Sequence, residues 1–113
     1  MFDFQKLEVY KKIRRANKKV FLFIQQHPKL PLKLKDQLFR AALSIALNTA
    51  EGAGRYTQAD KKHYYVQSRS TLFETIACLE ACNDIGEMSD LSLSESQMEY
   101  EEISKMLYGL SMK

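Results

Sequence analysis

Apolar residues recur every three to four positions along most of the chain, which is the spacing of amphipathic α-helices. The pattern is interrupted by Pro28 and Pro31, then by Gly52 and Gly54, and again at Gly86. Proline cannot continue a helix, and glycine can adopt the left-handed conformation that often closes one. Four helices are therefore predicted, over about residues 4–27, 34–51, 58–85 and 94–112.

No segment alternates apolar and polar residues as a strand does, so the sequence predicts an all-α fold. Short connections between the four helices predict an antiparallel up-down four-helix bundle, with residues 1–113 forming a single domain. Thr57, with Asp60 three residues later, resembles a capping box and predicts where the third helix begins. Either Ser92 or Ser94, each with Glu or Gln three residues later, offers the same signal for the fourth helix.

The first predicted helix separates charged from apolar residues around its axis. Its apolar arc can face a bundle core. The opposite side of the helix carries six lysine and arginine residues. These six are Lys11, Lys12, Arg14, Arg15, Lys18 and Lys19. Two interpretations stay open: a solvated polar face, or a surface that meets an acidic partner such as RNA, DNA or an acidic protein.

The second predicted helix is apolar over most of its circumference. One arc is sufficient to face the bundle core, and an adjoining apolar arc remains. That surplus arc consists of Phe39, Leu43, Ala46, Leu47 and Ala50. Since soluble monomers avoid exposed apolar patches, this arc predicts self-association; the alternative is that long side chains of the first helix cover it.

Arg69 is the one cation on the apolar arc of the third predicted helix. An unpaired cation in a core is unfavourable, so Arg69 is expected to pair with Glu80 or Glu51, or to extend its guanidinium to the surface. We predict a structural polar network rather than ligand recognition by Arg69. Its members would be Asn48, Glu51, Arg55, Arg69 and Glu80.

Charge is distributed unevenly along the chain, although the net charge is only +3. Residues 1–40 hold eleven Lys and Arg against three acidic residues, whereas residues 81–113 hold two against seven. This polarity favours an acidic partner for the first helix, or pairing between opposite ends of neighbouring subunits.

Signatures of catalysis are missing from the sequence: it has no P-loop, dinucleotide fingerprint or nucleophile elbow. Asp60-x-x-His63 is a single partial match to the paired motifs of metal-binding bundles. Cys78 and Cys82 are expected to pack in the core or in an interface. We therefore predict a non-enzymatic protein without metal or cofactor and, because no membrane span or signal peptide is recognisable, a cytoplasmic one.

Residues 37–55 contain the pattern Arg-Ala-Ala, Ser-Ile, Asn and Ala-Glu-Gly-x-Gly-Arg, and this segment resembles the central motif of 23S ribosomal RNA intervening-sequence proteins. Three further stretches agree with that family: Leu7–Tyr10, Ser68–Glu74 and Met106–Leu110. The resemblance implies a bacterial four-helix bundle protein whose relatives assemble as rings of five. One such relative, the accessory protein of diversity-generating retroelements, works with a reverse transcriptase and nucleic acid. The family offers no catalytic residues to transfer.

Together these observations predict an oligomer that binds RNA or DNA through the basic face of the first helix, with little sequence specificity. Assembly would be a homo-oligomeric ring, a homopentamer if it follows the relatives. The alternative is a scaffold that docks an acidic protein partner on the same face.

Overall fold

Five helices and no strand make up the chain in the computed structural model, which describes all of residues 1–113. The all-α class predicted from the sequence is confirmed. The helices are α1 (Asp3–Lys6), α2 (Glu8–Gln26), α3 (Leu32–Ala53), α4 (Gln58–Asp84) and α5 (Asp90–Ser111).

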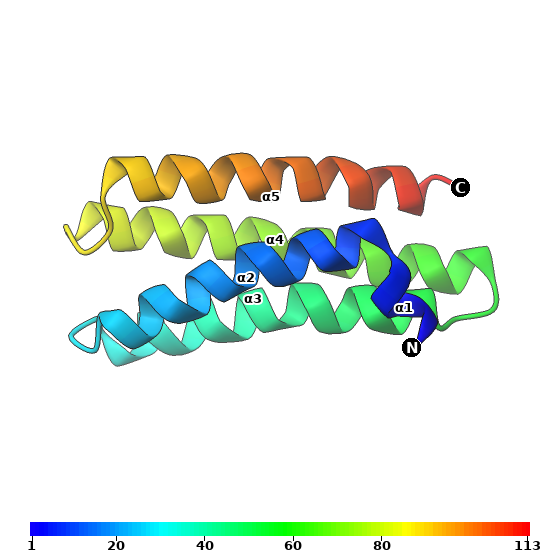
Figure 1. Ribbon diagram of the computed structural model, residues 1–113, viewed down its shortest axis with the longest axis horizontal. Coiled ribbons are helices and arrows are strands. Elements are labelled where there is room, and N and C mark those ends of the chain that lie inside the picture. The colour runs from blue at the N-terminus through cyan, green and yellow to red at the C-terminus, as the bar shows by residue number, and fades with distance from the viewer.

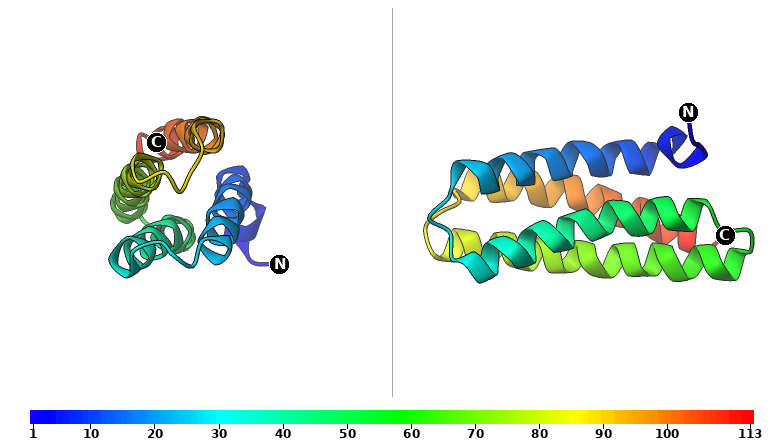
Figure 2. Two further views of the ribbon diagram at one scale, coloured as in Figure 1. Left: turned by 90° about the vertical axis from the view of Figure 1, so that its left-hand side faces the viewer. Right: turned by 90° about the horizontal axis from the view of Figure 1, so that it is seen from below.

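The four long helices lie side by side, and the chain reverses direction at each connection between them (Figure 1). Helix α2 packs against α3 and α5, and α4 packs against the same two helices. Neither α2 with α4 nor α3 with α5 is in contact, so these pairs occupy diagonal corners (Figure 2). As a result, the α2/α3 side and the α4/α5 side are opposite faces of the molecule.

The N-terminal helix differs from the prediction because it is split at Leu7. This residue has an extended backbone, with φ −68° and ψ 129°, and separates α1 from α2. The bend lets Leu7 pack on the core and places the ring of Phe4 edge-on to Tyr10, with ring centroids 5.0 Å apart. These apolar contacts outweigh the continuity of one longer helix.

Among the last three helices, the predicted start is right for α4, two residues late for α3 and four residues late for α5. Helix α4 begins directly after Thr57, whose side chain accepts a hydrogen bond from the backbone N–H of Asp60 at 3.1 Å. Helix α5 begins at Asp90 because Ser89, rather than Ser92 or Ser94, is its cap. Helix α3 begins at Leu32, since Pro31 at its N-cap needs no backbone donor.

Glycine serves two different purposes at the helix ends. Gly86 closes α4 with φ +82°, as predicted. By contrast, α3 continues through Gly52, and Gly54 ends it in a right-handed conformation, so the predicted left-handed closure there is wrong. Gly52 is required for space instead: a Cβ atom there would lie 3.0 Å from Tyr64 Cβ and 3.0 Å from Tyr65 Cε1. It allows α3 and α4 to approach closely.

The apolar arcs of the long helices meet in a single buried core that contains two polar links. In the first, the Tyr100 hydroxyl donates to Asn17 Oδ1 at 2.7 Å, and Asn17 Nδ2 donates to the carbonyl of Ala42 at 2.7 Å. In the second, the hydroxyls of Thr49 and Ser68 are 2.9 Å apart and join α3 to α4. Both links satisfy groups that would otherwise be buried without a partner.

Candidate functional site

The six cations of α2 form its basic face but point in three directions. One pair turns toward α3, one pair turns toward α5, and one pair lies on the outer ridge between them. In that order the pairs are Arg14 and Lys18, Lys12 and Lys19, and Lys11 and Arg15. Of the ridge pair, Lys11 also lines the hollow toward α3, and Arg15 lines the hollows on both sides.

The cations that face α5 are already paired within the chain. Lys12 Nζ lies 2.9 Å from Glu102 Oε1, and Lys19 is bonded to Glu99. The hydrogen bond and charge of Glu99 raise the pKa of Lys19, and Lys12 lowers the pKa of Glu102 in the same way. Pairs this exposed add little stability, but they neutralise two of the cations that the sequence offered to a partner.

Only half of the predicted basic face is free of intrachain carboxylates. Lys11 Nζ lies 3.3 Å from Glu8 Oε1, an exposed pair within one turn of α2. Arg14, Arg15 and Lys18 form no ion pair, and all three are exposed. The expectation that all six cations are available is therefore corrected: the acidic α5 lies alongside α2 and takes two of them.

An open groove of about 730 Å³ lies between α2 and α3 and is closed at one end by α1. Cations line its α2 wall, apolar side chains line its α3 wall, and aromatic rings lie between them. The residues that matter here are Arg14, Lys18, Leu43, Ala46, Tyr10 and Phe21. The groove therefore combines apolar surface with positive charge.

The apolar strip of α3, defined as Phe39, Leu43, Ala46, Leu47 and Ala50, borders this groove. Phe39, Leu43 and Leu47 are 45%, 36% and 58% exposed. Phe21 of α2 lies over Phe39 with ring centroids 5.2 Å apart, but this contact covers the strip only in part. The alternative that long side chains of α2 cover the strip is wrong, because Phe39 and Leu47 stay about half exposed.

A second exposed apolar surface lies on the opposite side of the molecule. Val66 and Phe73 on α4 and Tyr108 on α5 are each about half exposed. Arg69 lies among them, with its guanidinium carbon 5.3 Å from the centre of the Phe73 ring and 5.0 Å from that of Tyr108. No pattern in the sequence identified this surface separately.

Of the two alternatives predicted for Arg69, the carboxylate partner is wrong and the extension of the guanidinium to the surface is observed. Its Nε donates to the carbonyl oxygen of Ser104 at 3.2 Å and to the Ser104 hydroxyl at 3.1 Å. Packing of α5 against α4 supplies these oxygens, and the two aromatic faces stabilise the cation. The terminal nitrogens of Arg69 have no partner in the chain, and they are not buried.

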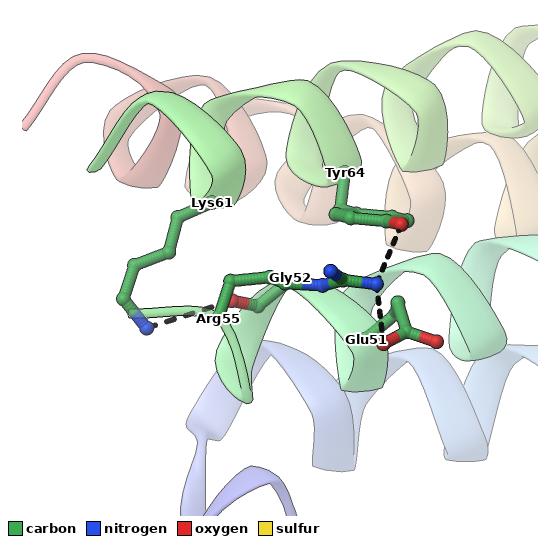
Figure 3. A network of polar contacts seen from close by, with 5 residues as sticks. All are labelled: Glu51, Gly52, Arg55, Lys61 and Tyr64. Atoms are coloured by element: carbon green, nitrogen blue, oxygen red, sulfur yellow. Dashed lines mark hydrogen bonds and ion pairs between the residues drawn. The ribbon is translucent and has the colours of Figure 1, made fainter. Parts of the chain in front are cut away.

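Glu51 and Arg55 do meet, at the turn between α3 and α4 (Figure 3). Arg55 donates to Glu51 Oε2 at 3.1 Å and to the Tyr64 hydroxyl at 2.8 Å. Lys61 Nζ approaches the carbonyl of Gly52 at 3.5 Å from the first turn of α4. These contacts fasten the end of α3 to the start of α4.

The other members of the predicted network are elsewhere. Asn48 donates to the carbonyl of Ser44 at 3.0 Å on its own helix, and Glu80 is exposed and forms no ion pair. The network therefore does not assemble as predicted, since its members lie on different sides of α3 and α4.

The groups with reactive potential are few. Cys78 and Cys82 are buried free thiols, as expected for packing residues, and burial raises both pKa values, that of Cys82 to about 11. No three His, Cys, Asp or Glu side chains are close enough to hold a metal ion. None of the helices has the length and apolar character needed to cross a membrane.

The family model for the 23S rRNA-intervening sequence protein matches residues 5–109, nearly the whole chain. The chain belongs to this family. A crystal structure of a protein with unknown function from the S23 ribosomal protein family of Bacteroides thetaiotaomicron is similar, with a TM-score of 0.82 and 21% identity. The similarity covers 93% of this chain and 99% of that one, and at this identity it shows the fold alone. No curated protein matches the chain significantly.

In this member of the intervening-sequence protein family, the motif that carried the resemblance has a structural role. The Glu-Gly-x-Gly-Arg stretch from Glu51 to Arg55 forms the closely packed α3–α4 junction described above. The end of the motif therefore secures the fold, whereas the apolar strip of α3, which lies in the same segment 37–55, is exposed.

Sequence reasoning missed the buried link between Asn17 and Tyr100. A signal was present, since Asn17 lies on the apolar arc of its helix beside Ile13 and Val20. A polar residue in such an arc needs a buried partner. The partner could not be assigned, because Tyr100 is 83 residues away and only the packing of α5 on α2 brings it near.

Proposed function

We propose that the chain is a non-enzymatic, antiparallel up-down four-helix bundle that self-associates and binds RNA or DNA with little sequence specificity. The observation that carries the proposal is the division of charge between the two sides of the molecule. Residues 1–57, which form α1 to α3, contain twelve Lys and Arg against four Asp and Glu. Residues 58–113 contain five against ten.

Nucleic acid would contact the ridge of α2. Arg15 and Lys11 lie on this ridge, Lys18 is adjacent, and none of the three is buried. Phosphate contacts of this kind position a backbone without reading bases. The relation to retroelement accessory proteins that the sequence motif implies also points to nucleic acid.

Self-association is supported by the apolar strip of α3. Exposed Phe39, Leu43 and Leu47 lie in one row along the helix, and a row of this kind is unusual on a soluble monomer. Repetition of the basic ridge in an oligomer would multiply the phosphate contacts. The size of five subunits follows from the resemblance to known relatives alone.

The test is the salt dependence of binding to a short RNA or DNA duplex, measured by fluorescence anisotropy. On duplex DNA, each phosphate contact steepens the slope of log affinity against log salt by about 0.9. The variant Lys11→Gln/Arg15→Gln/Lys18→Gln removes the three cations on and beside the ridge, so we expect its slope to be shallower by about 2.7. Failure of the wild type to bind at low salt would contradict the proposal.

A matched control removes the same amount of charge elsewhere. Lys62, Lys105 and Lys113 are exposed cations outside the first three helices. The variant Lys62→Gln/Lys105→Gln/Lys113→Gln should keep the wild-type slope. If both triple variants lose binding equally, net charge rather than the ridge is responsible.

A second candidate function is a scaffold that docks an acidic protein. The groove between α2 and α3 favours it, because apolar Leu43 lies opposite Arg14 and Lys18 and could receive an acidic, amphipathic surface. A salt slope near zero, with self-association or protein binding intact, would support this candidate over nucleic-acid binding.

A further inference from the structure

We infer that the groove between α2 and α3 binds a single strand of RNA or DNA and selects it over a duplex. The inference rests on nucleic-acid binding in the proposed function and specifies which form of nucleic acid the chain prefers. It divides the basic side of α2 into two parts. The outer ridge contacts phosphates, and the groove beside the ridge also contacts unpaired bases.

Aromatic rings and cations form one row along the α2 wall of the groove. The row consists of Tyr10, Arg14, Lys18 and Phe21, which all line the groove and follow one another at intervals of four, four and three residues. Such intervals place side chains on one side of a helix, and at 1.5 Å per residue the row extends over about 16 Å. A ring therefore lies at each end of the row, and two cations lie between the rings.

The groove contains no negative charge to balance these cations. No Asp or Glu lines it, and Arg14 and Lys18 form no ion pair within the chain. The opposite wall is apolar, with Ala46 and with Leu43, which is 36% exposed. Unpaired cations opposite an apolar wall suit a ligand that carries anions along one edge and apolar faces along the other.

An unpaired nucleic-acid strand has both kinds of group. In a duplex the flat faces of the bases are stacked inside, so the duplex offers mainly its phosphates to a protein surface. In a single strand the bases can turn outward and stack on aromatic side chains while the phosphates contact Lys and Arg. Here the bases would lie on the half-buried rings of Tyr10 and Phe21 and against Leu43. Arg14 can hold a phosphate through two parallel hydrogen bonds.

The rings also distinguish this ligand from an acidic protein segment. Carboxylates of such a segment would need the cations alone. Aromatic rings beside cations are the combination that single strands use. The observations therefore favour a nucleic-acid strand in the groove.

The groove leaves most of the apolar strip of α3 available for self-association. Of the strip, only Leu43 and Ala46 line the groove, whereas Phe39, Leu47 and Ala50 lie outside it. Binding of a strand and contact with another copy therefore use different parts of the strip.

The first test compares two fluorescein-labelled probes by anisotropy at one salt concentration: an oligothymidylate and a DNA duplex of the same length. A surface that acts through charge alone binds the duplex more tightly, because phosphates are denser along a duplex. We expect the reverse order, with the oligothymidylate bound about tenfold more tightly. An affinity for the duplex equal to or higher than that for the oligothymidylate would overturn the inference.

Removal of the two rings tests the stacking directly. Tyr10→Leu/Phe21→Leu keeps the charge and the apolar character of the groove, so duplex affinity should not change. Affinity for the oligothymidylate should fall about tenfold. The matched control, Phe73→Leu/Tyr108→Leu, removes one phenylalanine and one tyrosine from the α4/α5 side and should leave both affinities unchanged. Circular dichroism checks that both variants are folded, and equal losses in the two would contradict a role for the groove.

A tryptophan reporter locates the strand without changing the core. The chain has no tryptophan, so Leu43→Trp introduces a single indole at an exposed position of the groove. Oligothymidylate should quench its fluorescence by stacking, and the duplex should not. Phe73→Trp reports from the opposite side of the molecule, and its fluorescence should stay constant with both probes.

The outcomes separate this inference from the proposed function. If the oligothymidylate binds but leaves the Leu43→Trp indole unquenched, the strand does not enter the groove, although binding to the ridge stands. Quenching by polyglutamate but not by oligothymidylate would assign the groove to an acidic protein instead. Failure of both nucleic acids to bind at low salt would contradict the proposed function itself.

Discussion

The contact between α3 and α4 and the contact between α2 and α5 are built from different chemistry. At α3–α4, small or neutral residues lie close together: Gly52 admits the rings of α4, and Thr49 shares a hydrogen bond with Ser68. At α2–α5, one buried link between Asn17 and Tyr100 lies beneath long charged side chains at the surface.

This difference separates residues that determine the fold from residues that adjust the surface. Buried, neutral hydrogen bonds cannot be exchanged for water without loss of stability, whereas exposed ion pairs can. The exposed ion pairs between α2 and α5 therefore determine how many cations of α2 are free to meet a partner. They contribute little to the stability of the fold. Three substitutions test this comparison.

The largest effect is expected from Tyr100→Phe. It removes the hydroxyl that donates to Asn17 Oδ1 and leaves a buried acceptor unsatisfied, which typically costs about 1–3 kcal/mol. We expect the free energy of unfolding to fall by about 2 kcal/mol in urea titrations. A loss of unfolding free energy smaller than that of Glu99→Gln/Glu102→Gln would contradict the comparison.

The next effect is expected from Gly52→Ala. The new Cβ would lie 3.0 Å from Tyr64 Cβ, which is fixed close to the backbone and cannot move aside. Overpacking of this kind costs about 1–3 kcal/mol, and the better helix propensity of alanine returns up to about 1 kcal/mol. A net loss of about 1–2 kcal/mol should appear in thermal or urea unfolding.

Gly54→Ala is the matched control for that substitution. A Cβ at Gly54 has its nearest neighbour at 3.7 Å, which is ordinary contact, and the backbone there is right-handed. Stability should be unchanged or slightly higher. Equal losses at Gly52 and Gly54 would show that chain flexibility, rather than space, requires glycine in this motif.

The smallest effect on stability is expected from Glu99→Gln/Glu102→Gln. The variant frees Lys19 and Lys12 on the surface, so unfolding should change little. Nucleic-acid binding should strengthen instead, and two more available cations would steepen the salt slope on duplex DNA by about 1.8. Unchanged binding would mean that these lysines do not contact the nucleic acid.

The pH dependence of the α2–α5 contact has a definite sign. Lys12 lowers the pKa of Glu102 from the ordinary value of 4.5, so the stabilisation is fully present above pH 4.5. It disappears as the pH falls through the lowered value, because the protonated carboxyl no longer attracts Lys12. The small stability difference between wild type and Glu102→Gln should vanish in that acidic range.

Helical periodicity predicted the fold class and the extent of the long helices to within a few residues. It could not predict the helix break at Leu7, because this break depends on the packing of Phe4 on Tyr10 rather than on a local stop signal. The start of α5 was predicted late, since several serines offer similar capping signals and only the structure identifies Ser89 as the cap.

The candidate surfaces were predicted less completely. Periodicity correctly identified the exposed strip of Phe39, Leu43 and Leu47, because an apolar arc beyond the one facing the core must lie at the surface. It could not show that Glu99 and Glu102 neutralise two lysines, or that Arg69 bonds Ser104. Those contacts depend on which helices are neighbours, and no local pattern contains that information.

Self-association is tested most directly by the mass of the unmodified chain in solution, measured by sedimentation equilibrium. The exposed apolar strip of α3 predicts a mass of at least twice 13.1 kDa at micromolar concentration. A mass of 13.1 kDa at every concentration and salt would contradict it.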